Sequence, residues 1–175
     1  MRFSKKATAI LTVIFLCFSL VVSSMSFAAD TTTPAASDGD KLKVEKVTAS
    51  NEAYPDTAPV SKLLDGDITD NSYWTSDKNN VTVDFDLGKP YNMTVVKMAF
   101  YNSSTQQCKF DLAVSDDGKT WTDVSKNNAS KQGDATLQPF PVNKTGRYLR
   151  IIGHGNTTVK WYMFTSINEV EIYGK

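Results

Sequence analysis

Oxygen-bearing side chains of the kind that bind hard cations gather in one short stretch of this chain. The stretch from Ser61 to Ser76 places several of them around a turn-forming Gly66, namely Asp65, Asp67, Asp70 and Ser72. Calcium takes about six to eight oxygens from carboxylates, carbonyls and hydroxyls. One short loop rarely encloses such an ion, so we expect Glu169, in the C-terminal stretch Ile167–Gly174, to complete the shell. The fold must then bring the two ends of the chain together.

The first 28 residues have the pattern of a secretory signal peptide. A basic start precedes an apolar run over Ala7–Val22, and Ser26 and Ala28 are the small residues that cleavage after Ala28 requires. The alternative is a permanent membrane anchor, but the run is shorter than the roughly 20 apolar residues of a spanning helix. We therefore expect residues 1–28 to be removed and the protein to be secreted. Residues 29–41 read as a flexible leader, and residues 42–175 as one domain.

Charge and cysteine usage exclude two classes of protein. Without residues 1–28 the chain holds 16 basic and 19 acidic residues, a net charge of about −3. Nucleic-acid binding favours clustered basic surfaces, so we expect no nucleic-acid partner. Cys108 is then the one remaining cysteine, which rules out an intramolecular disulfide. A secreted domain of this kind must be stabilised by its core or by a metal, and Cys108 is most simply a small buried residue on a strand.

The hydrophobic pattern predicts an all-β domain. Short alternating segments are separated by Gly, Pro, Asn and Asp, which is typical of a sandwich or barrel. One plausible helix, of a turn or two, lies near Pro59–Leu64, where proline can begin a helix. No crossover helix exists, which excludes a parallel α/β architecture. The predicted strands are Val81–Leu87, Val95–Tyr101, Phe110–Ser115, Gly146–Gly153 and Glu169–Tyr173.

Five sequence segments occur in the order typical of discoidin domains, the coagulation factor 5/8 type C domains. They are Tyr54–Trp74, Asp86–Gly88, Val114–Val124, Arg147–Ile151 and Asn168–Ile172. The chain resembles this family from about Val44 to Tyr173, and in particular its bacterial branch of galactose-binding-like carbohydrate-binding modules. The resemblance implies a jelly-roll β-sandwich of two antiparallel sheets with a structural calcium ion.

The resemblance also implies a set of metal ligands. The family pattern uses backbone carbonyls and acidic, amide or hydroxyl side chains, which fall here on Lys62, Asp65, Asp67, Ser72, Asn168 and Glu169. The loop between Asp67 and Trp74 is two residues longer than is usual in the family, so Asp70 could replace Ser72. The competing interpretation is that Asp65-Gly66-Asp67 merely forms a turn.

Sugar recognition needs an aromatic face and a few directional hydrogen-bond partners in the loops at one end of a jelly roll. The run Trp161–Phe164 is the leading aromatic candidate, although it could instead pack as core. A lone histidine is more often structural than ligand-binding. Trp74 and Trp121 are expected in the core. The predicted carbohydrate-binding residues are Glu52, Tyr54, Tyr101, Gln106, His154, Trp161 and Tyr162.

Departures from the family pattern argue against simple galactose specificity. Thr75 stands where many galactose-binding members carry a histidine, and the loop after Tyr101 holds Ser, Thr and Gln instead of an arginine. The segment from Gly153 to Trp161 looks like modules attached to bacterial polysaccharide lyases. Uronate-containing polysaccharides are therefore the expected ligands, and a bacterium the expected source.

The sequence predicts a binder and not an enzyme. It contains no recognisable Ser/His/Asp set, no Cys–His pair and no phosphate-binding glycine loop. The leading hypothesis is a secreted, monomeric carbohydrate-binding module. The alternative is an adhesion domain that binds proteins or membranes, which the absence of a basic cluster beside Trp161 makes less favoured. A small lyase or hydrolase is the third hypothesis.

Overall fold

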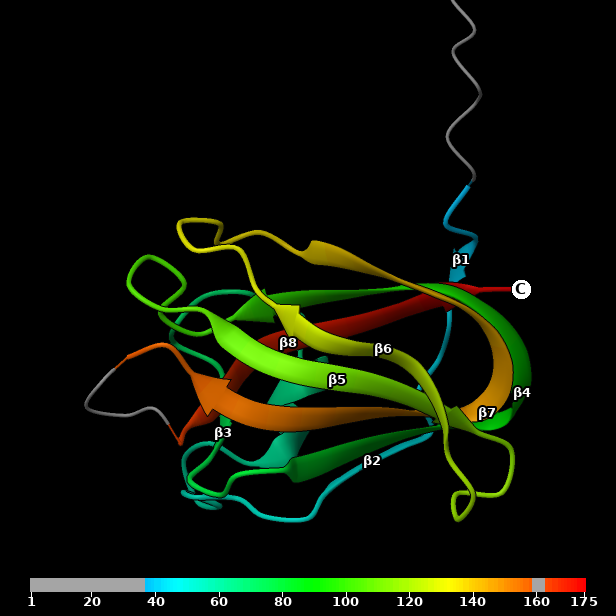
Figure 1. Cartoon of the computed structure of the whole chain (residues 1–175), viewed down its shortest axis with the longest axis horizontal. Coiled ribbons are helices and arrows are strands. Elements are labelled where there is room, and N and C mark those ends of the chain that lie inside the picture. Colours follow the sequence, from blue (N-terminus) through cyan, green and yellow to red (C-terminus); the bar gives the residue numbers. More distant parts are fainter. Residues whose placement is uncertain (1–36, 159–162) are drawn as a thin grey trace, which may run out of the picture. The chain divides into compact units, whose positions relative to one another are not determined.

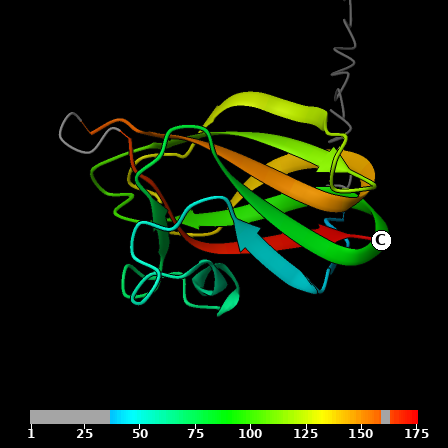
Figure 2. The same cartoon turned by 90° about the horizontal axis from the view of Figure 1, so that it is seen from below.

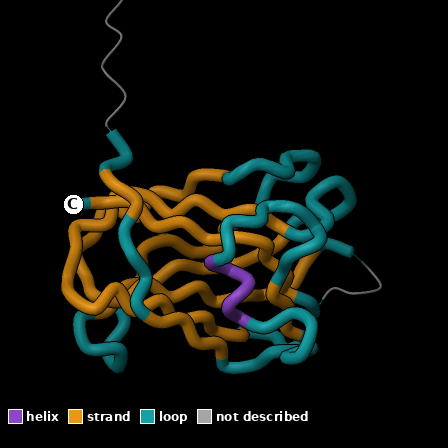
Figure 3. The backbone as a smooth tube through the Cα atoms, turned by 180° about the vertical axis from the view of Figure 1, so that it is seen from behind, coloured by secondary structure: helices purple, strands orange, loops and turns teal. Residues whose placement is uncertain are grey.

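A computed structural model of the chain describes residues 37–158 and 163–175. In this part the chain forms eight strands and one 3₁₀ helix, and every strand pair is antiparallel (Figure 3). The described residues belong to one compact unit. The elements are β1 (Asp40–Lys41), β2 (Lys46–Ala49), η1 (Val60–Leu64), β3 (Trp74–Ser76), β4 (Val81–Phe100), β5 (Cys108–Ser115), β6 (Thr122–Ala129), β7 (Gln138–Asn156) and β8 (Thr165–Gly174).

The two longest strands, β4 and β7, bend and so divide the sheet into two layers. Their pairing shifts register between Asp86 and Tyr91, where Gly88 has a φ of 79° that favours glycine. Both strands curve at the same end of the molecule (Figure 1). β4 and β7 pair with each other on both sides of the bend, but their other neighbours differ between the two sides. The two halves of the sheet therefore face each other as the layers of a sandwich. The all-β, antiparallel sandwich predicted from the sequence is confirmed.

Each layer follows from the strand register. The first half of β4 lies between β2 and the second half of β7, which continues to β5 and β6. The second half of β4 lies between the first half of β7 and β8, and β8 also pairs with β1 and β3. The loops from β2 to β3 and from β4 to β5 lie at the end opposite the bends (Figures 1 and 2).

The core lies between the two layers and follows the alternation of the sequence. The predicted inward residues of β4, Val81, Val83, Phe85 and Leu87, are all buried. Trp74 is fully buried and Cys108 is buried, as predicted. Trp121 was also expected in the core, but this prediction is wrong: the side chain is half-buried. It lies at the surface, where the guanidinium carbon of Arg150 is 3.8 Å from the centroid of its ring.

The predicted strands lie within the observed ones, but two segments predicted as separate strands belong to one long strand. Val81–Leu87 and most of Val95–Tyr101 belong to the single strand β4, because the chain bends at Gly88 without leaving the sheet. The turn predicted near Pro59 is η1, which begins directly after that proline. Asp40 and Lys41, at the end of the expected leader, pair with Gly174 and Tyr173, so the sheet begins before residue 42. No helix among the described residues has the length and apolar character to cross a membrane.

An ion pair fastens β4 to β7 beside the bend. The Asp86 carboxylate accepts hydrogen bonds from Arg147 Nε at 2.7 Å and from a terminal guanidinium nitrogen at 2.8 Å. It also accepts the Gly88 backbone N–H at 2.7 Å. The Arg147 hydrogen bonds are the largest cause that lowers the pKa of Asp86 to about 2.

We therefore expect acid to weaken the fold through Asp86. Its folded pKa of about 2 lies below the unfolded value of about 3.9, so its stabilisation is present above about pH 4 and is lost as the pH falls through the folded pKa. Arg147→Met should flatten this dependence in urea denaturation measured at successive pH values. Lys43→Met, which breaks an exposed pair with Glu45, should leave the dependence as in the wild type. The same slope in all three proteins would contradict this assignment.

Candidate functional site

The early acidic loop and the last strand meet in the fold. Leu63 is fully buried and anchors η1, which packs beside β8 (Figure 3). Gly66, with a φ of 81°, turns the chain after η1 so that its N–H donates to Glu169 Oε2 at 3.0 Å. Residues about one hundred positions apart in the sequence therefore share one cluster, which we call the acidic cluster: Lys62, Asp65, Asp67, Ser72, Asn168 and Glu169.

Asp65 organises the loop side of the acidic cluster. Its carboxylate accepts the Ser72 hydroxyl, the Asp67 N–H at 3.0 Å and the Lys62 ammonium at 3.3 Å. Partial burial alone would raise the pKa of Asp65, but these hydrogen bonds outweigh it and lower the pKa. Asp65 is therefore an ionised, oxygen-rich centre for the loop.

Glu169 is a buried carboxylate with little compensation. It is 1% exposed, and burial raises its pKa to about 7, with the Gly66 hydrogen bond acting in the opposite direction. No lysine or arginine of the described segments forms an ion pair with it. Burying an unpaired charge is costly, and a divalent cation between Glu169 and Asp65 would remove that cost.

Two further predicted ligands, Asp67 and Asn168, form hydrogen bonds with the backbone of the loop after Gly66. Asp67 accepts the Thr69 N–H at 2.8 Å, and Asn168 donates to the Ile68 carbonyl at 3.0 Å. The Asn168 side-chain oxygen is buried and has no hydrogen-bond partner in the described structure. Ser72, and not Asp70, contacts Asp65; Asp70 accepts from Asn168 Nδ2 and from the Asn102 N–H.

The donor set suits a hard cation, but carboxylates alone do not form the site. Within residues 37–158 and 163–175, no three His, Cys, Asp or Glu side chains are gathered closely enough to hold a metal ion. Like-charged carboxylates repel one another, and here Asp67 turns to the backbone. Calcium binding would therefore need the Ser72 hydroxyl and backbone carbonyls as well. Glu169, which has no ion-pair partner among the described residues, and the ionised Asp65 would supply the carboxylate part of such a shell.

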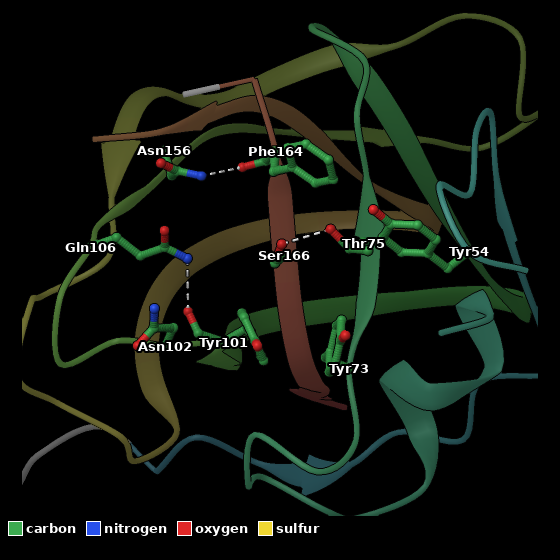
Figure 4. A pocket seen from close by; sticks show the side chains of 9 residues that line it. All are labelled: Tyr54, Tyr73, Thr75, Tyr101, Asn102, Gln106, Asn156, Phe164 and Ser166. Carbon is green, nitrogen blue, oxygen red and sulfur yellow. Dashed lines mark hydrogen bonds between the residues drawn. The ribbon is translucent and has the colours of Figure 1, made fainter. Parts of the chain in front are cut away.

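A pocket of about 290 Å³ opens at the loop end of the sandwich. It is formed by the loop after β2, by β3, by the loop after β4, by the end of β7 and by the residues at the start of β8 (Figure 4). We call it the loop-end pocket. Its lining residues are Tyr54, Tyr73, Thr75, Tyr101, Asn102, Gln106, Asn156, Phe164 and Ser166.

Aromatic rings from separate elements line the loop-end pocket. Tyr73 and Tyr101 lie with ring centroids 4.3 Å apart and planes inclined by 36°. Tyr54, which is 52% exposed, and Phe164 stand on other sides of the opening (Figure 4). Burial raises the pKa of the Tyr101 hydroxyl, with further contributions from Tyr73 and Asp70, so this hydroxyl is a neutral hydrogen-bonding group.

Hydrogen bonds hold the polar lining in place. Thr75 and Ser166 join their hydroxyls at 2.7 Å across the β3–β8 pair. Gln106 donates to the Tyr101 carbonyl at 3.2 Å, and Asn156 donates to the Phe164 carbonyl at 2.9 Å (Figure 4). The described lining contains amides, hydroxyls and rings but no charged side chain. Such a pocket can stack a ring and direct hydrogen bonds to it.

The predicted carbohydrate-binding residues fall into several places. Tyr54, Tyr101 and Gln106 line the loop-end pocket. Glu52 accepts the Val60 N–H at 3.1 Å and so caps the start of η1. His154 lies elsewhere, between Asn80 at 2.9 Å and Asp111 at 3.0 Å. Trp161 and Tyr162 lie outside the described residues.

Six lining residues lie outside the predicted set, although Phe164 belongs to the run Trp161–Phe164 that the sequence indicated as the leading aromatic candidate. They are Tyr73, Thr75, Asn102, Asn156, Phe164 and Ser166. Tyr73 directly follows Ser72, and an aromatic residue beside the acidic loop is a signal that could have indicated it. Thr75 and Ser166 carry no such signal, because their meeting depends on the register of β3 against β8.

Comparisons with known proteins agree on the fold. The sequence pattern of the F5/8 type C domain family matches residues 46–169. The CBM32 module of AlyQ, solved in complex with 4,5-unsaturated mannuronic acid, is 27% identical, with a TM-score of 0.68 over 77% of this chain and 98% of that module. Truncated AlyQ, with its CBM32 and alginate lyase domains, is also 27% identical with a TM-score of 0.68 over 78% of this chain, which spans 34% of that longer protein.

A pectin-binding carbohydrate-binding module shares 21% identity, with a TM-score of 0.62 over 75% of this chain and 91% of the module. An identity this low supports a shared fold and nothing about the ligand. No curated protein matches the sequence.

Proposed function

Since the chain belongs to the F5/8 type C domain family, we propose that it is a secreted, non-catalytic carbohydrate-binding module that holds a polysaccharide in the loop-end pocket. The observation that carries the proposal is the lining of that pocket, where Tyr54, Tyr73, Tyr101 and Phe164 surround fixed amides and hydroxyls. The C–H face of a pyranose stacks on aromatic rings, and amides and hydroxyls read its hydroxyl groups. Apolar walls with a few placed polar groups are what small-ligand sites require.

Uronate-containing polysaccharide is the proposed ligand class. The support for this class is that the module that is 27% identical was solved with 4,5-unsaturated mannuronic acid. Thr75 stands where many galactose-binding members carry a histidine, and it pairs its hydroxyl with that of Ser166, which argues against simple galactose as the ligand.

We also propose that the acidic cluster holds a structural calcium ion. Asp65, Asp67, Ser72 and Glu169 would supply side-chain oxygens, and Lys62 and Asn168 backbone carbonyls. Calcium, when bound, supplies positive charge that offsets the buried Glu169 and joins the loop after η1 to β8. Asp65 and Ser72 hold the loop side of the cluster through their hydrogen bond.

Binding without cleavage is supported by where the carboxylates lie. A glycoside hydrolase needs two carboxyl groups on either side of the bond that it cleaves. The described lining of the loop-end pocket contains none. Glu171 is engaged by the Lys41 ammonium at 2.7 Å and the Tyr173 hydroxyl at 2.6 Å, and Glu169 belongs to the acidic cluster.

Titration calorimetry with mannuronate and galacturonate oligosaccharides, in calcium, tests the proposal. We expect reversible binding that Tyr54→Ala weakens about tenfold, as for an exposed ring at the edge of a site. Tyr91→Ala removes a ring near the strand bend, where Lys89 covers it, and should leave the affinity unchanged. Turnover of either oligosaccharide would contradict the non-catalytic proposal. The absence of binding to these and to a wider glycan array would contradict the function itself.

Membrane binding is the second candidate, favoured by one observation. Tyr54 and Met163 are large apolar side chains, 52% and 40% exposed, on the segments that frame the pocket. Sedimentation with vesicles of phosphatidylcholine and phosphatidylserine separates the two functions. Vesicle binding in the absence of glycan binding would support the alternative.

A further inference from the structure

Asp70 joins the acidic cluster to the loop-end pocket. Its Oδ1 accepts the Asn102 backbone N–H at 2.9 Å and the Asn168 side-chain amide at 3.2 Å. Asn102 lines the pocket, whereas Asn168 precedes Glu169 on β8 and is 1% exposed. One carboxylate oxygen therefore connects the loop after η1, the last strand and the loop after β4.

The bond to Asn102 fixes the start of the turn after β4, which is closed on itself by the Thr105 N–H donating to the Asn102 carbonyl at 3.1 Å. Asn102 has a φ of 51°, a left-handed conformation that residues other than glycine adopt at a cost. Tyr101 precedes it and supplies a pocket ring, and the Tyr101 carbonyl receives Gln106. Without an acceptor for the Asn102 N–H, this turn can relax and carry the Tyr101 ring with it.

The loop 65–73, which contains Asp70, also reaches the pocket at its C-terminal end. Ser72 contacts Asp65 in the acidic cluster, and the next residue, Tyr73, stacks on Tyr101 at 4.3 Å. The loop 65–73 thus begins among the candidate cation ligands and ends on a pocket ring. Whatever orders this loop also orders the Tyr73–Tyr101 pair.

We propose that Asp70 is the positioning residue of the loop-end pocket and that, through it, occupation of the acidic cluster by calcium raises glycan affinity. This inference rests on the proposed function. Asp70 touches neither the glycan nor the cation; it fixes the turn at Asn102 relative to β8. Calcium restricts the loop 65–73 from the other side, so that a first ligand reduces the ordering cost of the second.

Affinity for a mannuronate tetrasaccharide, measured by calorimetry with calcium and with chelator, tests the inference. We expect Asp70→Ala to weaken binding about tenfold in calcium, as for loss of a charge-assisted hydrogen bond. Asp70→Asn keeps an acceptor oxygen and should recover most of that loss. Asp116→Ala, an exposed substitution in the turn after β5, should bind as the wild type does. Chelation should weaken the wild type by a larger factor than it weakens Asp70→Ala, in which only the Ser72–Tyr73 end of the loop still connects the acidic cluster to the pocket.

Two measurements without glycan distinguish positioning from other roles. The Asn102 amide resonance should shift in Asp70→Ala and return towards its wild-type position in Asp70→Asn. The calcium-induced rise in melting temperature should persist in Asp70→Ala, because Asp70 is not a ligand of the ion. Loss of that rise would make Asp70 a metal ligand and overturn the inference, as would unchanged affinity in Asp70→Ala. Failure of the wild type to bind any glycan would instead overturn the proposed function, and with it the part of this inference that concerns affinity.

Discussion

Replacing Tyr73 or Tyr101 with alanine is expected to weaken glycan binding by about thirtyfold or more, and replacing both to weaken it further. Truncating an aromatic residue at the centre of a desolvated site commonly costs about 2 kcal/mol or more, which is about thirtyfold in affinity. The two rings lie 4.3 Å apart, so each also holds the other in place. The loss in the double variant should therefore be smaller than the sum of the single losses. Calorimetry with uronate oligosaccharides measures all three.

Phenylalanine variants separate the ring from its hydroxyl. Tyr73→Phe and Tyr101→Phe keep the stacked surface, so most of the affinity should survive if stacking carries the binding. A loss in the phenylalanine variants as large as in the alanine variants would assign the energy to the hydroxyls. Tyr91→Ala is the control for removing a tyrosine elsewhere. Wild-type affinity in the alanine variants would exclude the loop-end pocket as the binding site.

Chelation of calcium is expected to lower the melting temperature of the wild type by about 10 °C. A ligand that binds only the folded state at about 100 times its Kd stabilises that state by about 2.7 kcal/mol, and a domain of this size shifts by about 3–5 °C for each kcal/mol. Glu169→Gln should lose most of this response, because it removes the buried charge that calcium offsets. Scanning calorimetry at one fixed pH, with calcium and with chelator, measures the effect.

The melting temperature of Glu169→Gln in chelator is a second test of the calcium proposal. Without a cation, Glu169 is a buried carboxylate that is 1% exposed and has a costly charge. Glu169→Gln should therefore melt at or above the wild-type temperature in chelator, although it melts below the wild type in calcium. Glu45→Gln, on an exposed side chain paired with Lys43, should follow the wild type in both. A wild type that is insensitive to chelator would exclude the calcium proposal.

The local pattern of the sequence was sufficient for the strands that form the core. Alternation over Val81–Leu87 identified an inward face that is buried in full, because successive side chains on a strand point to opposite faces. The acidic loop Ser61–Ser76 and Glu169 were also identified from residue type, and the fold joins that loop to Glu169 through the Gly66 N–H. The signal peptide and the roles of Trp161 and Tyr162 stay predictions.

The loop-end pocket was only partly predictable. Tyr54, Tyr101 and Gln106 could be chosen because each lies in a loop that a jelly roll presents at one end. Thr75 and Ser166 are 91 residues apart, and their hydroxyls meet because β3 pairs with β8. Residue type could not decide between Ser72 and Asp70 as a ligand, whereas the structure directs Ser72 to Asp65 and Asp70 to Asn102.

Periodicity and motif order are properties of neighbouring residues, so the all-β class, the inward faces of the strands and the family could be predicted from the chain. That β4 and β7 each belong to both layers, that Tyr73 contacts Tyr101 and that Asp70 binds Asn102 could be seen only in the folded molecule. These outcomes depend on strand register and on the packing of loops distant in sequence. Such contacts form only when the closed sandwich repays the entropy of bringing those segments together.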